Sequence, residues 1–487
     1  KALEQQIELL TMKKEHLEVL INFARKIKTT GVNKMEFQEK NVLVFGSWKS
    51  GIAAAELVEK QNANIFVFEG NEKQSVAEIK EKSESFAKAE IYVGTLPEEV
   101  MDKLDFVVLS PGVPTDLPLV NAMRDKKITI IGEIELAYQV AKGKILAITG
   151  TNGKTTTTTL VGEILSNYFK DVKVVGNIGI PYTSVAADTT EETVTAAEIS
   201  SFQLETIVDF APDVSAILNI TPDHLNRHHT MENYIKAKED ITKNQKANDV
   251  CVLNYEDEVL RKFGESLSMK VLWFDSKKPV QNGCYLNGEK IIYVSEGKEE
   301  EVIDVNELNI LGTHNYENVM AAVAMTISIG VPLDVIVKTL REFQAVEHRI
   351  EYVTEKRGVK FYNDSKGTNP DAAIKGIQAM NRPTLLIGGG YDKQSEYDEW
   401  IESFDGKVKK LVLIGVTKEK IADCAKRHGF TDYVFADSLE EAVNICYDNA
   451  VSGDAVLLSP ACASWDMFKS YEERGRIFKD LVRNLKE

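Results

Sequence analysis

The chain has 487 residues, more than one compact core usually holds, and this length predicts about two to four domains. A hydrophobic content of 43% with 27% charged residues is typical of globular proteins and argues against extended disorder. The formal net charge of -17 argues against nucleic acid as a partner, because affinity for a polyanion comes from clustered Lys and Arg. No apolar run approaches the length of a membrane span, so we expect a cytoplasmic protein without membrane insertion. The scattered cysteines lack paired spacing and predict reduced thiols rather than a disulfide framework or a zinc site.

Residues 1–36 differ in pattern from the rest of the chain. Apolar residues from Leu3 to Ile27 recur at steps of three and four among Lys and Glu, which predicts an amphipathic helix or a helical hairpin. The pattern ends near Gly31, and Met35 stands directly before the first expected strand. We therefore expect a helical extension or a fusion segment here, and a monomeric protein unless this helix dimerises.

An α/β pattern begins at Asn41. A buried strand over 42–45 leads into a turn over 46–51, a helix over 52–59, and a second strand that ends at Glu69. This order of strand, glycine turn, helix, strand and acid is typical of the nucleotide-binding half of a doubly wound sheet, and dehydrogenases share it. A further strand over 106–109 runs into Ser110 and continues the same sheet.

Two more α/β units follow the first. The second opens with a strand from Ile145 to Thr149, and the third has strands at 384–387, 410–414 and 455–458. Each unit alternates strands and helices and can bury its own core. We expect three α/β domains in series: a Rossmann-like domain over 37–140, a central P-loop ATPase-like domain with a mainly parallel sheet over 141–345, and a Rossmann-like C-terminal domain over 346–487.

The strongest local feature is the stretch from Thr149 to Thr156, which joins a strand to a helix. Successive backbone N–H groups and the helix N-terminus suit phosphate oxygens, Lys154 adds a positive charge, and Thr155 or Thr156 offers a hydroxyl to Mg²⁺. The general P-loop pattern requires glycine at the position of Ile148, so the stretch predicts a shortened phosphate loop. A turn that merely caps a helix is the alternative, and the flanking strand and helix argue against it.

Further polar residues follow strands of the central domain. Glu198 ends one strand, His224 follows the next, and Lys238 lies in the helical stretch after it. A carboxylate and an imidazole at strand ends are reasonable ligands for Mg²⁺ or Mn²⁺ beside a bound triphosphate. Taken singly, each is as well explained as a structural histidine or a solvated acid, and their position after the phosphate loop favours the functional interpretation.

The last domain carries a similar group in four loops, the first of which holds His348 and Arg349. Lys366 and Thr368 follow one strand, Lys393 follows the next, and Ser464 follows the last. Two cations with two hydroxyls predict a pocket for a small dicarboxylate. Any one of them alone is as readily an ordinary surface residue.

These residues together resemble the Mur ligase family from about residue 37 to the end. The loop from Gly150 to Thr155 and the stretch Gly176–Gly179 are shared across the family. The stretches 200–204, 363–369 and 461–466 resemble the members that add D-glutamate. Trp48 departs from the family, which usually has a small residue at that place in the nucleotide turn.

The resemblance implies a set of site residues. ATP would be bound by Gly150, Thr151, Asn152, Gly153, Lys154, Thr155, Thr156, Asn315, Asn318, Arg349 and Asp364. The uridine-diphosphate substrate would meet Ser50, Glu69, Ser110, Asn177, Ser200 and Gln203, and D-glutamate would meet Lys366, Thr368, Lys393, Ser464 and Tyr471. The metal ligands would be Thr155, Glu198, His224 and Lys238, the last as a carbamate formed with CO₂, and the catalytic residues would be Lys154, Glu198, His224 and Lys238.

The implied activity is an ATP-dependent ligation with Mg²⁺ or Mn²⁺. The alanyl carboxylate of UDP-N-acetylmuramoyl-L-alanine would take the γ-phosphate of ATP, and the amine of D-glutamate would attack the resulting acyl phosphate. ADP and phosphate would leave, and the product would enter peptidoglycan biosynthesis.

Three other functions compete with this hypothesis. Another ligase of the family would add L-alanine, a diamino acid or a glutamate tail on folate, and the missing Asp-Asn-Pro-Arg motif argues against the diamino acid enzyme. An oxidoreductase rests only on the stretch from Gly46 to Glu69 and leaves the phosphate loop unexplained. A non-catalytic sensor dimerised by the leading helix would not need Lys154, Glu198, His224 and Lys238.

Overall fold

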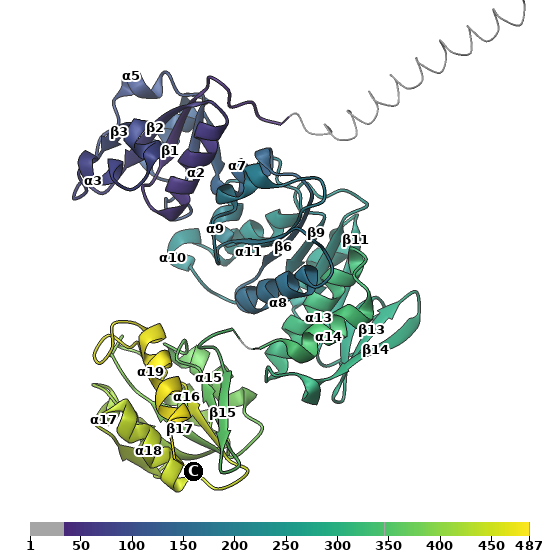
Figure 1. The fold of residues 1–487 in the computed structure, drawn as a ribbon, viewed down its shortest axis with the longest axis vertical. Coiled ribbons are helices and arrows are strands. Elements are labelled where there is room, and N and C mark those ends of the chain that lie inside the picture. Colours follow the sequence, from purple (N-terminus) through teal and green to yellow (C-terminus); the bar gives the residue numbers. More distant parts are fainter. Residues whose placement is uncertain (1–33, 345, 487) are drawn as a thin grey trace, which may run out of the picture. The chain divides into compact units, whose positions relative to one another are not determined.

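The computed structural model describes residues 34–344 and 346–486, so most of the helix expected over 1–36 lies outside the described residues. Contacts divide the described chain into two compact units. The first holds residues 34–143, 179–193 and 200–211, and the second holds residues 144–178, 194–199 and 212–486. Three α/β sheets follow one another along the chain, as the sequence predicts (Figure 1). In the part of the chain that is described, every helix is too short or too polar to cross a bilayer.

The first sheet has five parallel strands in the order β3-β2-β1-β4-β5. Its strands are β1 (Asn41–Phe45), β2 (Asn64–Glu69), β3 (Glu90–Val93), β4 (Phe106–Leu109) and β5 (Thr129–Gly132), and its helices are α2 (Lys49–Lys60), α3 (Val76–Lys80), α4 (Glu84–Lys88), α5 (Glu98–Met101), α6 (Pro118–Asp125) and α7 (Glu133–Val140). The strands are short apolar runs because a parallel sheet is covered on both faces. The strand order reverses between β1 and β4, and α/β sheets bind ligands beyond the strand ends at such a switch point.

Helix α2 begins three residues earlier than expected, at Lys49 rather than Ile52, so the glycine turn is shorter than predicted. Gly51 therefore lies inside the helix. A Cβ on Gly51 would stand 1.9 Å from the carbonyl oxygen of Gly46, so only glycine allows the helix to start this close to β1.

The second sheet has nine strands in the order β14-β13-β12-β11-β10-β9-β6-β8-β7. The seven strands from β6 to β12 are parallel, and β13 and β14 add an antiparallel edge. The strands are β6 (Lys144–Thr149), β7 (Val172–Gly176), β8 (Val194–Glu198), β9 (Val214–Ile217), β10 (Val250–Asn254), β11 (Lys270–Asp275), β12 (Gly283–Asn287), β13 (Lys290–Ser295) and β14 (Lys298–Asp304). The helices of this region are α8 (Lys154–Ser166), α9 (Ser201–Leu204), α10 (Leu225–His228), α11 (Met231–Glu239), α12 (Glu258–Ser266), α13 (Thr313–Ser328) and α14 (Leu333–Glu342).

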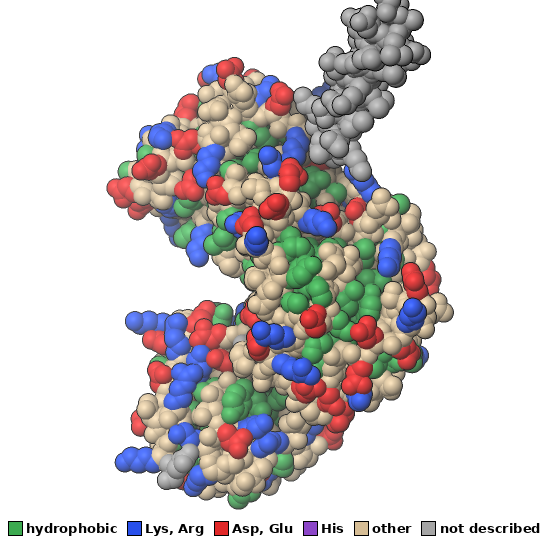
Figure 2. Space-filling view, turned by 45° about the vertical axis from the view of Figure 1, so that its right-hand side comes forward, with side chains coloured by type: hydrophobic (Ala, Val, Ile, Leu, Met, Phe, Trp, Pro, Cys, Tyr) green, Lys and Arg blue, Asp and Glu red, His purple; other side chains and the backbone are tan. Residues whose placement is uncertain are grey.

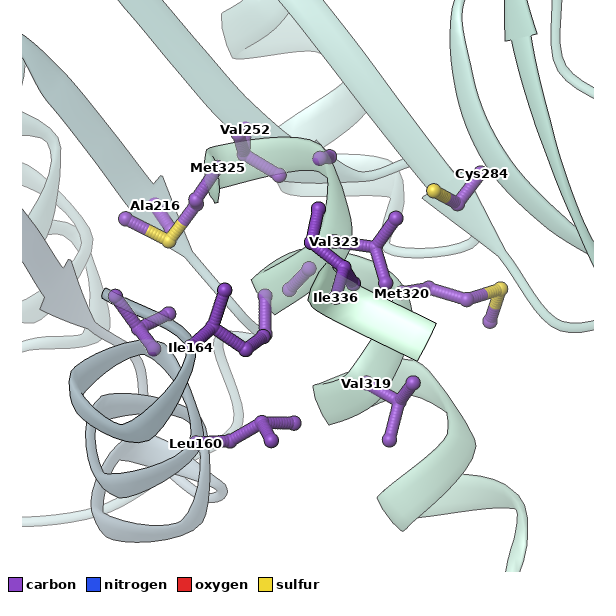
Figure 3. Packing of buried hydrophobic residues seen from close by; sticks show 14 of the residues in the cluster. Leu160, Ile164, Ala216, Val252, Cys284, Val319, Met320, Val323, Met325 and Ile336 are labelled. Carbon is purple, nitrogen blue, oxygen red and sulfur yellow. The ribbon is translucent and has the colours of Figure 1, made fainter. Parts of the chain in front are cut away.

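The core of this sheet lies where α8 and α13 pack against it (Figure 3). Leu160 and Ile164 of α8 belong to the same buried cluster as Val319 and Val323 of α13, and all four side chains are fully buried. The stretch from Val319 to Met325 is buried at every position, because α13 is covered on all sides. This packing fixes α8, whose first turn carries the phosphate loop.

The third sheet has six strands in the order β15-β16-β20-β17-β18-β19, all parallel except the antiparallel pair β15 and β16. Its strands are β15 (Glu351–Lys356), β16 (Val359–Asn363), β17 (Thr384–Gly388), β18 (Val408–Leu413), β19 (Tyr433–Phe435) and β20 (Ala455–Leu458). Its helices are α15 (Pro370–Ala379), α16 (Asp398–Glu402), α17 (Lys418–Arg427), α18 (Leu439–Asn449) and α19 (Tyr471–Arg483). Successive strand residues such as Leu457 and Leu458 enter two different core clusters, one on each face of the sheet.

In the described part of the chain, the face shown in Figure 2 carries acidic and basic side chains interspersed with one another. The excess of acidic residues is therefore not gathered in one patch of that face.

The α8–α13 packing makes a prediction for stability. Replacing the buried Ile164 with alanine removes apolar contacts and leaves a cavity, so we expect the free energy of unfolding of the central domain to fall by about 2–5 kcal/mol. Urea unfolding followed by circular dichroism measures this change. The matched control is Ile180→Ala, because the Ile180 side chain is 46% exposed and its loss should cost less than about 1 kcal/mol. Equal losses in the two variants would contradict the assignment of this core.

Candidate active site

The phosphate loop connects β6 to α8 and is held by the neighbouring strand β9. Two of its glycines have left-handed backbone angles, with φ of +147° at Gly150 and +86° at Gly153. Asn219, just beyond β9, accepts a hydrogen bond from the backbone N–H of Asn152 at 2.8 Å and donates one to the Asn152 carbonyl oxygen at 3.1 Å. The backbone N–H of Thr151 bonds to the carbonyl oxygen of Asn219 at 2.9 Å. The loop is thus a fixed element before any ligand arrives.

Gly153 is the position where side-chain size matters most in this loop. A Cβ there would stand 2.2 Å from the amide oxygen of Asn318 on α13. Asn318 in turn donates a hydrogen bond to Asn315 at 3.2 Å, and both side chains are buried. The two asparagines predicted to lie near adenine are therefore packed beside the phosphate loop. Thr155 and Thr156 lie in the first turn of α8, the former partly exposed and the latter buried.

Two lysines converge on one carbonyl oxygen of the loop. Lys154 Nζ donates to the Gly150 carbonyl oxygen at 2.8 Å and to that of Thr151 at 2.9 Å. Lys238 Nζ, from α11, donates to the same Gly150 oxygen at 2.8 Å. Burial lowers the pKa of Lys154, and burial together with the nearby Lys154 ammonium lowers the pKa of Lys238 to about 7. Two predicted catalytic residues are thus brought together at a place that favours an anion.

Glu198 ends β8 and is 1% exposed. Its Oε1 accepts a hydrogen bond from the side chain of Asn177 at 2.8 Å, and the Asn177 backbone N–H bonds to the Glu198 carbonyl oxygen at 2.8 Å. Its Oε2 is buried and has no hydrogen-bond partner among the described residues. A buried carboxylate oxygen in this state is a ready ligand for a cation. Glu198 and Asp223 both lie close enough to Lys154 to raise its pKa, against the larger effect of burial.

His224 follows Asp223 in the loop after β9. It adopts a left-handed backbone conformation with φ of +51°, and its side chain is 52% exposed. His224 Nε2 lies 3.5 Å from Asp223 Oδ2. The loop is tied to the phosphate loop because Thr151 Oγ1 accepts a hydrogen bond from the backbone N–H of Thr221 at 3.0 Å. The structure therefore brings this loop to the lysines, while His224 itself is paired with its neighbour Asp223.

In the first unit, Ser110 and Gln203 line one narrow pocket together with Glu133 and Phe202. Ser200 and Gln203 form a reciprocal capping box at α9, in which Gln203 Oε1 accepts hydrogen bonds from Ser200 N at 2.9 Å and Ser200 Oγ at 3.0 Å. The buried Glu133 carboxylate also bonds to the Gln203 side chain. Three of the residues predicted to meet the uridine-diphosphate substrate are thus grouped, whereas Asn177 belongs to the second unit.

The nucleotide turn of the first sheet is built around Glu69. Its carboxylate accepts hydrogen bonds from Ser47 N at 3.1 Å and Ser47 Oγ at 2.6 Å, so Glu69 shapes the turn directly. Ser50 lies in the first turn of α2 and is partly buried. Trp48 points outward with 72% of its side chain exposed, and Lys82 Nζ stands 5.0 Å from its ring centroid.

In the C-terminal domain, the predicted residues for D-glutamate fall into two neighbouring groups. Lys366 Nζ lies 5.9 Å from the ring centroid of Tyr471, and Thr368 is two residues further along the same loop. Lys393 Nζ lies 5.0 Å from the ring of Trp465, the residue that follows Ser464. The loops of the second group are paired by the backbone bond from Tyr391 N to the Ala463 carbonyl oxygen at 2.9 Å.

Asp364 and Arg349 lie beside these groups. Asp364 accepts a hydrogen bond from Ser459 Oγ at 2.6 Å and is buried, and burial raises its pKa to about 7 although Ser459 and Arg349 act in the opposite direction. Arg349 Nε and Ser464 Oγ are buried atoms without hydrogen-bond partners in the part of the chain that the structure describes. Unsatisfied polar atoms are uncommon in proteins, and at predicted site residues they indicate a place for a ligand.

The sequence analysis gave no role to two residues that hold the site together. Asn219 holds the phosphate loop through hydrogen bonds. Its position just after β9 is the one feature of the sequence from which this role could have been predicted. Arg474, fully buried, donates to Ser365 Oγ at 2.9 Å and to the Cys462 carbonyl oxygen at 3.3 Å, and so ties the loops after β16 and β20 to α19. In the sequence, Arg474 belongs to the resemblance that begins with the stretch 461–466, but its burial and its hydrogen bonds are not visible there.

Comparisons with known proteins match the chain to three family models in order. Residues 40–132 match the Mur ligase MurD-like N-terminal domain, residues 148–326 the Mur ligase middle domain, and residues 348–462 the Mur ligase glutamate ligase domain. A relative from Lachnoclostridium phytofermentans named UDP-N-acetylmuramoylalanine--D-glutamate ligase is 58% identical and covers 93% of this chain and 100% of its own. One of the same name from Lachnospira eligens is 55% identical with the same coverage.

A solved structure extends the likeness to the fold. The MurF ligase of Thermotoga maritima in complex with ADP is 18% identical, aligns with a TM-score of 0.55, and covers 92% of this chain and 97% of its own. At this identity the likeness shows the fold alone.

The close approach of Gly153 to Asn318 makes a prediction for nucleotide binding. In Gly153→Ala the new methyl group meets the Asn318 oxygen and the backbone is strained, so we expect affinity for a non-hydrolysable ATP analogue to fall by at least about tenfold, or 1.4 kcal/mol. Isothermal titration calorimetry measures this affinity. Gly288→Ala is the matched control, because Gly288 also has a positive φ but has nothing within 4 Å of its Cβ position. Unchanged affinity in Gly153→Ala would contradict the role of this loop.

Proposed function

The chain belongs to the Mur ligase family, and we propose that it carries out its reaction with the residues gathered around the phosphate loop and the C-terminal loops. Like the relatives it matches over their whole length, it is an ATP-dependent ligase that joins D-glutamate to UDP-N-acetylmuramoyl-L-alanine in peptidoglycan biosynthesis. The main support for this location of the active site is that Lys154 and Lys238 both donate to the Gly150 carbonyl oxygen, directly after β6.

Members of the Mur ligase family use ATP, and we place its phosphates on the loop from Gly150 to Thr156. The N-terminus of α8 supplies backbone N–H groups, and the partly buried Lys154 supplies charge. Asn315 and Asn318 lie on the adjoining helix, where they would meet the adenine side of the nucleotide. Arg349 and Asp364 would approach the nucleotide from the C-terminal domain.

Magnesium or manganese would be held by Glu198, His224, Thr155 and a modified Lys238. The fit rests on the buried Glu198 Oε2, which lacks a partner among the described residues. When bound, the metal would neutralise charge on the phosphates. Lys154, Glu198 and Asp223 surround the place where this charge would develop.

Lys238 would carry a carbamate formed with CO₂. An ammonium repels a divalent cation, whereas a carbamate oxygen binds one, and only a neutral amine reacts with CO₂. The burial of Lys238 fits this role, since it disfavours the charged amine. The side chain is already fixed against the phosphate loop at Gly150.

A carboxylate reacts poorly with an amine, so the proposed reaction first converts it to an acyl phosphate. The precursor's carboxylate oxygen attacks the γ-phosphorus of ATP, the bond to the β,γ-bridging oxygen breaks, and ADP leaves. Lys154 would spread the charge of the transferred phosphoryl group. The amine of D-glutamate then attacks the acyl carbon, loses a proton, and phosphate leaves as the amide forms.

The amino acid would be bound by Lys366, Thr368, Lys393, Ser464 and Tyr471. Two ammonium groups suit the two carboxylates of D-glutamate, and the unpartnered Ser464 Oγ offers a further hydrogen bond. The uridine-diphosphate substrate would meet Ser50, Glu69, Ser110, Asn177, Ser200 and Gln203. We further propose a cytoplasmic enzyme, which the five free and buried cysteines support, and a monomer unless the leading helix dimerises.

A panel of amino acids tests the substrate. With ATP and UDP-N-acetylmuramoyl-L-alanine, we expect phosphate release at least about 100-fold faster with D-glutamate than with L-glutamate, L-alanine or a diamino acid, because the site is built for a D-dicarboxylate. Phosphate assay and the product mass measure it. Phosphate release without any amino acid would contradict ligation. Faster phosphate release with another amino acid would assign the chain to a different ligase of the family.

The Lys238→Ala variant tests the carbamate. We expect phosphate release to fall by about 10²–10³-fold, the usual cost of removing one group that stabilises developing charge, and to recover in part when acetate or formate is added. Lys236→Ala is the matched control, because Lys236 lies on the same helix but is exposed and paired with Asp240 at 2.7 Å. Full activity in Lys238→Ala would show that no carbamate is needed.

A further inference from the structure

Two packed helices of the C-terminal domain carry metal-ligating side chains outside the candidate active site. Asp398 begins α16, Cys424 lies in α17, and His428 directly follows α17. One ligand atom from each of these three residues lies within 4.8 Å of the other two. The Cys424 side chain is buried, Asp398 is partly buried, and the His428 side chain is 24% exposed.

The spacing on each helix explains why these groups meet. Cys424 and His428 are four residues apart, as are Asp398 and Glu402, so each pair lies on one face of its helix. His428 Nε2 lies 2.7 Å from Asp398 Oδ1, and His428 Nδ1 lies 3.5 Å from Glu402 Oε1. One imidazole nitrogen therefore faces the Asp398 and Cys424 groups, while the other faces a carboxylate.

We propose that Asp398, Cys424 and His428 bind a divalent metal of the zinc type, with Glu402 orienting the imidazole. Thiolate, imidazole nitrogen and carboxylate oxygen are the ligands that zinc prefers, and three protein ligands leave a fourth position for water. A carboxylate on the second imidazole nitrogen is the usual partner of a metal-bound histidine. The single cysteine explains why no paired spacing in the sequence predicts the site.

Binding requires the loss of one proton from the thiol. The Cys424 thiol lies beside Asp398, and its proton leaves to solvent as the sulfur-metal bond forms. In the bound state the Nε2 electron pair goes to the metal, and a proton on Nδ1 faces Glu402. No electrons are transferred.

An ion-pair network is the competing explanation of this cluster. Arg427 Nη2 lies 3.3 Å from Asp398 Oδ1, and His428 bonds to the same oxygen, so these charges alone would join the two helices. The ion-pair network gives the Cys424 thiol no role, whereas in the metal site this thiol is a ligand. The Arg427 side chain is 59% exposed and can turn into solvent when a cation replaces it.

Cobalt titration of the full chain tests the proposal, because a thiolate ligand gives Co²⁺ a charge-transfer band that oxygen and nitrogen ligands do not. We expect one Co²⁺ per chain with this band, which zinc abolishes by competition. Cys424→Ser should lose the band. Cys446→Ser, which alters another buried thiol of the same domain, should keep it. The proposed magnesium site contains no sulfur, so it cannot produce the signal.

Two further variants separate ligation from folding. His428→Gln changes a partly exposed side chain and should weaken Co²⁺ binding while circular dichroism stays unchanged, and Glu402→Gln should weaken it by about 10–100-fold, as expected for a group that orients a ligand. Arg427→Ala should bind Co²⁺ more tightly. Absence of the thiolate band in the native chain, or a band that survives in Cys424→Ser, would overturn the proposal and leave the ion-pair network as the explanation.

Discussion

The proposed chemistry of the central domain depends on two lysines that share one carbonyl oxygen, the buried Lys238 and the partly buried Lys154. Lys154 and Lys238 both donate to Gly150, and like charges this close in a buried place repel each other. This repulsion falls when anionic groups bind beside the two lysines or when one lysine loses its charge. A polyphosphate does the first and a carbamate does the second, and both belong to the proposed reaction. The acidic Glu198 and Asp223 beside Lys154 would give the same place the affinity for a cation that we propose.

This arrangement depends on packing that contains no charge at all. Helix α8 holds the phosphate loop at its first turn, and its buried face rests on α13, whose residues from Val319 to Met325 are all inaccessible. The same helix α13 places Asn318 against Gly153. A change in the helix contact would therefore move both the loop and the residues expected beside adenine. Stability and nucleotide binding are coupled through one core.

The C-terminal domain organises its site in a different way. There, Arg474 reaches from α19 to the loops after β16 and β20 through hydrogen bonds to Ser365 and Cys462. A fully buried guanidinium is costly unless all its donors are used, so this residue fixes loops rather than binding a ligand. The helices α16 and α17, on which we propose a zinc-type site, carry no predicted substrate residue. A metal there would join two helices of the domain without entering the reaction.

The sequence by itself determined the three α/β units, the shortened phosphate loop and most of the candidate site, because these features are local: a strand, a glycine turn and a helix start within one short stretch. It placed the start of α2 three residues late, since the contact between Gly51 and Gly46 that permits the earlier start is not visible in propensity. Only the tertiary structure decided which residues meet. The pairing of Lys238 with Gly150, the clamp by Asn219 and the cluster of Asp398 with His428 join positions far apart in the chain, and the order of the strands brings them together.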